Sequence, residues 1–140
     1  MKKLFLFTLI FIPCLLFAQI KSGSYQSDYW SGYKYNNSTG KFESIGSEWL
    51  TNGFMITSEY MMWEQKGEEE LYYRWEFIED KNYDGDPCGV YSIKNKNSSD
   101  EVSKWIIKYK DNEFWWYLDY DSYKGTYISL MIFKHVKEID

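Results

Sequence analysis

Apolar and polar residues alternate along most of this chain, and a period of two is typical of half-buried β-strands. Residues 71–77 show the pattern clearly, because every second residue is apolar and the residues between include Arg74 and Glu76. The alternation recurs further along the chain. It predicts that each of these sets shares one face of a strand: Leu71, Tyr73, Trp75 and Phe77; Phe114, Trp116, Leu118 and Tyr120; Thr126, Ile128, Leu130 and Ile132.

Turn-forming residues separate the predicted strands. Asn52-Gly53 is the strongest hairpin signal in the chain, because a two-residue type I′ turn needs positive φ at both central positions. Residues 80–89 are polar and predict a loop, and residues 98–104 could form at most a turn or two of helix. Eight or nine strands joined by such short connections predict antiparallel pairing throughout.

These elements predict an all-β fold, a single antiparallel up-and-down barrel of about eight strands. We favour a barrel because several strands are long and closure removes exposed edges; a small β-sandwich is the alternative. In outline such a barrel resembles the lipocalins. The resemblance is architectural only and implies no ligand, because the first strand carries Tyr29-Trp30-Ser31-Gly32 in place of a Gly-x-Trp signature.

The first 18 residues read as a secretory signal peptide, with residues 19–140 forming the single β domain. Lys2 and Lys3 precede an apolar run that is too short for a bilayer span, and Ala18 offers a small residue at the cleavage position. The prediction is therefore a secreted, periplasmic or cell-envelope protein without a transmembrane span. An uncleaved N-terminal anchor is the less favoured alternative.

Removal of the signal changes the composition of the 140-residue chain. It leaves 122 residues with no alanine, one cysteine (Cys88) and one histidine (His135), and the net charge falls from −5 to −7 because two lysines are lost. A strongly acidic chain repels nucleic acid. A single cysteine rules out an internal disulfide framework, and the absence of alanine argues against a helical bundle.

One segment has the spacing of calcium ligands. Asp80, Asn82 and Asp84 alternate ahead of Gly85, as in the opening of a calcium loop, and Asp86 could add its backbone carbonyl. An EF-hand is rejected, because the twelfth position is a tyrosine and the flanking segments predict strands. These residues are equally typical of an ordinary hairpin loop, which we favour. Calcium is the only cofactor that the sequence suggests.

Aromatic residues are the broadest functional feature. Tryptophan and tyrosine occur on both faces of several predicted strands, although a barrel needs only one apolar face. Large rings filling the core are the favoured explanation. Flat rings also stack on sugars and apolar ligands. The candidates for such a binding site are Trp30, Trp49, Trp63 and Trp115.

The function predicted from these features is a small secreted binding module without catalytic residues, which takes a small apolar or glycan ligand in an aromatic pocket or face. The first alternative is an envelope protein that recognises or inhibits a protein partner. A secreted hydrolase is less favoured, because its paired carboxylates normally come from different strands, whereas Asp119 and Asp121 lie on one.

Overall fold

A computed structural model of the protein describes residues 19–65, 71–95 and 102–139. The described residues form strands only, and they contain no helix with the length and apolar character needed to cross a membrane. The strands are β1 (Gly23–Asn36), β2 (Lys41–Ile56), β3 (Tyr60–Gln65), β4 (Leu71–Tyr83), β5 (Asp86–Asn95), β6 (Ser103–Lys110), β7 (Glu113–Asp121), β8 (Thr126–Lys134) and β9 (Lys137–Ile139).

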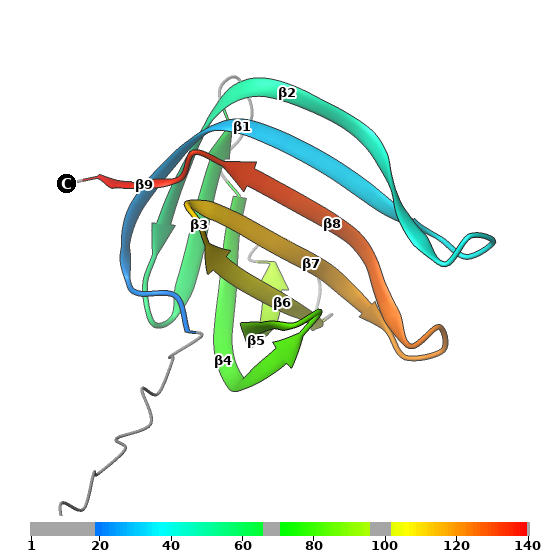
Figure 1. The fold of residues 1–140 in the computed structure, drawn as a ribbon. Helices are drawn as coiled ribbons and strands as arrows, with labels where there is room; N and C mark the ends of the chain where they lie inside the picture. The colour runs from blue at the N-terminus through cyan, green and yellow to red at the C-terminus, as the bar shows by residue number, and fades with distance from the viewer. Residues whose placement is uncertain (1–18, 66–70, 96–101, 140) are drawn as a thin grey trace, which may run out of the picture.

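The strands close into a barrel, as predicted. Strands β2 to β8 pair antiparallel in chain order, β8 pairs with β1, and β1 pairs back with β2 to complete the circle (Figure 1). The short β9 is an extra strand that pairs with β1 over Ser24–Gln26. The prediction of a lipocalin-like, eight-stranded antiparallel barrel is therefore confirmed, and the sandwich alternative is excluded.

The hairpin predicted at Asn52-Gly53 was wrong. Strand β2 runs through both residues, and the chain turns instead between Thr57 and Tyr60, where the hydroxyl of Thr57 accepts a hydrogen bond from the backbone N–H of Tyr60 at 3.1 Å. Asn52 is fully buried, and its Oδ1 accepts a hydrogen bond of 3.2 Å from Nε1 of Trp63 on the neighbouring strand. The Asn52 side-chain amide therefore bonds to a neighbouring strand and does not stabilise a turn.

The polar loop predicted over residues 80–89 was also wrong. Strand β4 continues to Tyr83 and β5 begins at Asp86, so only Asp84 and Gly85 form the turn. Both have positive φ, 50° and 81°, which is the requirement of a two-residue primed turn. The short helix predicted over 98–104 is strand from Ser103 onward, and residues 98–101 lie outside the described residues.

Aromatic rings fill the barrel interior. The Trp116 ring centroid lies 5.4 Å from Phe54, 5.7 Å from Trp63 and 4.7 Å from Phe133, and the ring planes are steeply inclined to one another. Edge-to-face contacts of this kind are favourable beyond the burial of their apolar area. The other buried members of this interior cluster are Ile20, Tyr25, Ile56, Met61, Trp75, Tyr91, Ile93, Trp105, Ile107, Phe114 and Val136.

A second buried cluster lies on the opposite face of the same wall. Val90 pairs with Ile106, and Ile106 pairs with Tyr117, so these three neighbours share the face that points away from Trp116. Tyr83, at the end of β4, packs on Tyr117 at 4.8 Å between ring centroids, and Phe42 of β2 packs on it at 6.0 Å. This second cluster explains why large aromatic residues occur on both faces of strand β7.

The interior packing gives a stability prediction. Trp116→Ala removes a ring that contacts four others, those of Phe54, Trp63, Trp105 and Phe133. We expect it to lower the free energy of unfolding by about 3–5 kcal/mol. The matched control is Trp49→Ala, which removes an indole that is 69% exposed and is expected to change stability by about 0.5 kcal/mol or less. Urea denaturation of both variants measures the difference, and equal losses would contradict the assigned interior.

Candidate functional site

Two of the four predicted ligand-binding tryptophans belong to the interior. Trp63 is buried against Trp116. Trp30 is half-buried and its ring lies over Gly32, where a Cβ atom would come within 2.7 Å of Cζ2 of Trp30. A side chain at position 32 would therefore force the Trp30 ring to move. Nε1 of Trp30 is buried and has no hydrogen-bond partner among the described residues.

The third tryptophan, Trp115, is half-buried on the outer side of β7. Its Nε1 donates a hydrogen bond of 3.0 Å to Oε2 of Glu113, and Nζ of Lys108 lies 4.4 Å from its ring centroid. Ammonium groups are attracted to an indole face at this distance. The ring of Trp115 is thus held by neighbours on β6 and β7.

Trp49 is the exposed member of the predicted set, with 69% of its surface accessible on the outer side of β2. The Tyr29 ring meets it edge-on at 5.0 Å, and the His135 imidazole stacks on it at 5.6 Å with 24° between the planes. His135 Nδ1 lies 2.6 Å from Oδ1 of Asp28. We call these four residues, Asp28, Tyr29, Trp49 and His135, the outer aromatic patch.

The barrel register brings the patch together. Tyr29 pairs with Trp49 on one side and with Lys134 on the other, so the residue after Lys134 reaches the same place. The pairing of β1 with β2 shifts between Ser27 and Tyr29, because β2 has one extra residue there, so Asp28 lies opposite a bulge formed by Leu50 and Thr51. Sequence reasoning missed this grouping because barrel pairing joins β1 to β2 and brings in His135, which is 107 residues from Asp28 along the chain.

The structure places the predicted calcium ligands along a hairpin. Asp80 and Asn82 lie on β4, Asp84 is in the turn, and Asp86 begins β5. Among the described residues, no group of three or more His, Cys, Asp or Glu side chains is placed to hold a metal ion. Calcium binding stays a prediction from the sequence.

Asp86 has two lysine partners from β6. Nζ of Lys108 lies 2.8 Å from one carboxylate oxygen and Nζ of Lys110 lies 2.7 Å from the other. Hydrogen bonds from these two ammonium groups lower the pKa of Asp86 from 3.8 to about 2, and the bond to Asp86 raises the pKa of Lys110. The Asp86 carboxylate therefore fastens the β4–β5 hairpin to β6.

The other candidate reactive side chains, Asp119, Asp121 and Cys88, are held in hydrogen bonds or buried. Oδ1 of Asp119 accepts a hydrogen bond of 3.2 Å from Nε1 of Trp105, and Oδ1 of Asp121 accepts one of 2.9 Å from the backbone N–H of Tyr123 in the turn. Cys88 is a fully buried free thiol whose pKa is raised by burial. Asp119 therefore binds a member of the interior cluster, Asp121 stabilises a turn, and Cys88 belongs to the second buried cluster.

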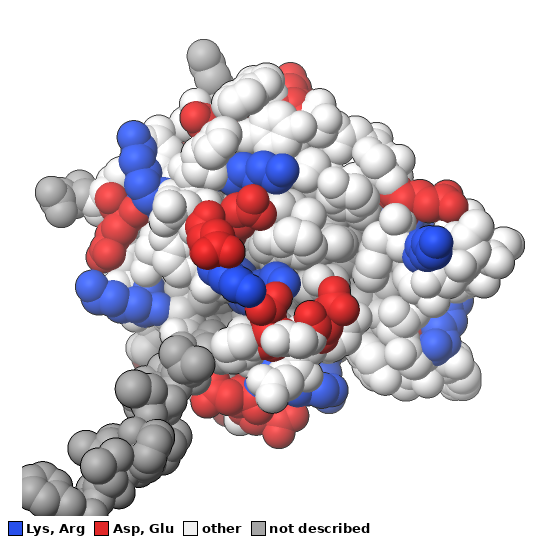
Figure 2. All heavy atoms as spheres, viewed as in Figure 1, with Lys and Arg blue, Asp and Glu red and all other residues white. Residues whose placement is uncertain are grey.

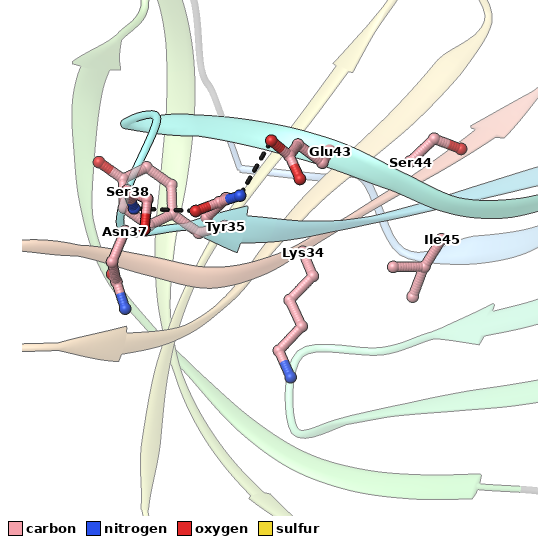
Figure 3. A pocket seen from close by; sticks show the side chains of 8 residues that line it. Lys34, Tyr35, Asn37, Ser38, Glu43, Ser44 and Ile45 are labelled. Carbon is pink, nitrogen blue, oxygen red and sulfur yellow. Dashed lines mark hydrogen bonds between the residues drawn. The ribbon is translucent and has the colours of Figure 1, made fainter.

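The β1–β2 hairpin carries two hollows beyond the barrel wall. One, of about 430 Å³, is lined by residues 34–38 and 43–45, and Figure 3 shows Lys34 and Ile45 extending from the same side of the ribbon. The other, of about 240 Å³, lies between this hairpin and the β7–β8 hairpin. Both linings are mixed, because each contains Lys34, Tyr35 and Asn37 together with an isoleucine, Ile45 in the larger hollow and Ile128 in the smaller.

Charge is mixed on the face of the molecule seen in Figure 2. Lysine and arginine side chains alternate there with aspartate and glutamate, and no patch of one sign dominates this view. Comparison with protein-family models, with curated proteins and with solved structures finds no match to the chain.

The Asp86 ion pairs give a prediction of acid sensitivity. A carboxylate whose native pKa lies below its unfolded value stabilises the fold above the unfolded pKa and loses that contribution as the pH falls through the native pKa. We therefore expect the wild-type protein to lose stability between about pH 4 and pH 2. Asp86→Asn should lower the melting temperature at pH 7 and reduce this dependence.

The control for that experiment is Asp84→Asn, two residues away in the turn. Asp84 forms no ion pair among the described residues, and asparagine also tolerates its positive φ. Melting temperatures of both variants and the wild type from pH 2 to pH 7 test the assignment. It is refuted if Asp86→Asn retains the full acid dependence or if both variants behave alike.

Proposed function

We propose that this protein is an exported binding module without catalytic activity, and that the outer aromatic patch holds a glycan. The observation that carries the proposal is the exposed indole of Trp49, oriented by Tyr29 and His135. Export is proposed from the basic and apolar N-terminal sequence.

The patch suits a sugar ring for two reasons. An exposed indole offers a flat apolar surface that can cover the C–H face of a pyranose, and its contacts with Tyr29 and His135 restrict the ring before any ligand arrives. Restricting a side chain in its bound orientation lowers the entropy cost of binding. Asp28 and His135 place polar atoms beside the indole, where sugar hydroxyls need hydrogen-bond partners.

The interior offers less support for an apolar ligand. The rings of Phe54, Trp63 and Phe133 all meet Trp116 within 5.7 Å between centroids. A ligand inside the barrel would have to displace these contacts. The glycan proposal therefore rests on the outer surface, and a lipid carried inside the barrel is the less favoured version of the same binding role.

A protein partner is the second candidate function. Met55 and Tyr60 are more than one-third exposed on adjacent strands, and Oη of Tyr60 lies 3.9 Å from the sulfur of Met55. Methionine and tyrosine are enriched at protein interfaces. Met55→Ser tests this candidate, because it should reduce partner recognition without affecting a glycan bound at Trp49.

The glycan proposal is tested by titration with neutral oligosaccharides. Cellohexaose, xylohexaose and chitohexaose are added separately while tryptophan emission and the heat of binding are measured. We expect at least one of them to bind. Loss of the main aromatic contact of an interface typically costs about 2 kcal/mol or more, so Trp49→Ala should weaken that binding about thirtyfold or more.

Tyr123→Ala is the matched control, because Tyr123 is a fully exposed aromatic residue at the β7–β8 turn, outside the patch. It should leave the affinity unchanged. The proposal fails if none of the three oligosaccharides binds, or if the Tyr123 variant loses as much affinity as the Trp49 variant.

A further inference from the structure

The smaller of the two hollows joins the ends of two hairpins. Its volume is about 240 Å³, and it is lined by Lys34, Tyr35 and Asn37 on one side and by Lys124, Thr126 and Tyr127 on the other. Cavities that hold drug-sized ligands are typically about 300–1,000 Å³. This one therefore suits a single small group, and it places two lysines around that group.

The first lysine lacks the partner that its position would give it. Lys34 lies directly opposite Glu43 in the β1–β2 ladder, where opposite charges normally pair. Oε1 of Glu43 instead accepts hydrogen bonds from Nδ2 of Asn36 at 3.0 Å and from the Thr39 hydroxyl at 3.2 Å. In Figure 3 the Lys34 side chain points away from the Glu43 carboxylate, and in the described part of the chain its ammonium group has no ion pair.

The charge of the second lysine, Lys124, is only weakly paired with a carboxylate. Nζ of Lys124 is 4.0 Å from Oδ2 of Asp121, the outer limit of an ion pair. The other oxygen of Asp121 accepts hydrogen bonds from the backbone N–H groups of Tyr123 and Lys124, so this carboxylate is held by the turn. In each hairpin the neighbouring carboxylate, Glu43 or Asp121, accepts hydrogen bonds from its own hairpin tip, while Lys34 and Lys124 both line the hollow.

We infer that this hollow binds the carboxylate of a small acidic ligand between Lys34 and Lys124. Charge-assisted hydrogen bonds from two ammonium groups would fix the carboxylate. Tyr35 and Thr126 also line the hollow and would contact the remainder of the ligand. A free carboxylic acid and an acidic sugar residue share this chemistry. The site is separate from Trp49 and does not depend on the glycan proposed there.

The test is a titration of the purified protein followed by amide NMR at constant ionic strength. Sodium glucuronate, sodium acetate and glucose are the three probes. We expect saturable shifts at Lys34, Tyr35 and Thr126 with the two carboxylates and none with glucose. Tighter binding of glucuronate assigns the site to an acidic sugar, and equal binding of acetate assigns it to a simple carboxylate.

Variants decide whether the two lysines are responsible. Lys34→Gln and Lys124→Gln should each weaken carboxylate binding about tenfold or more, as expected for loss of a hydrogen bond to a charged group. Lys81→Gln, an exposed lysine on β4, is the control and should change the affinity less than about twofold, as expected for a charge that makes no direct contact. The inference is overturned if neither carboxylate gives saturable shifts, if glucose gives the same shifts, or if the control loses as much affinity.

Discussion

Contact between aromatic rings inside the barrel is the interaction on which the rest of this structure depends. Trp116 meets Phe54, Trp63 and Phe133, one ring from each of three other strands, and so ties opposite walls together. A mature chain without alanine and with few leucines fills its core mainly with large rings and β-branched residues. Because those rings occupy the interior, we propose that ligands are recognised on the outer surface.

The second buried cluster also limits where a ligand could bind on the outer surface. Strands β5 to β8 are covered on both faces, because Tyr83 and Phe42 fold over Tyr117 from the ends of neighbouring hairpins. The β1–β2 pair is different, since its 14-residue and 16-residue strands both close the barrel and extend beyond it. Both proposed binding surfaces use this pair, with Trp49 on its outer side and Lys34 near its end.

Much of the fold followed from local patterns, and the failures have identifiable causes. Alternation predicted that Phe114, Trp116, Leu118 and Tyr120 share one face of a strand. The first three do, and that face is the interior, but the left-handed conformation of Asp119 ends the pattern before Tyr120. Asn52-Gly53 carries a turn signal that a bond from a tryptophan eleven residues away overrides. The sequence indicated four tryptophans as candidates for ligand binding. It could not show which of them are buried and which exposed, because burial depends on the pairing register of the barrel strands.

The most direct test of the central claim uses protein in which the seven tryptophans are replaced by 5-fluorotryptophan. Each labelled residue gives its own ¹⁹F signal, and single Trp→Phe variants assign the signals. The labelled protein is titrated with cellohexaose, xylohexaose and chitohexaose, and separately with palmitate. The account predicts that an oligosaccharide shifts the Trp49 signal while the signals of Trp63 and Trp116 stay fixed with every ligand. Palmitate-induced shifts of Trp63 and Trp116, with Trp49 unchanged throughout, would contradict it and place recognition inside the barrel.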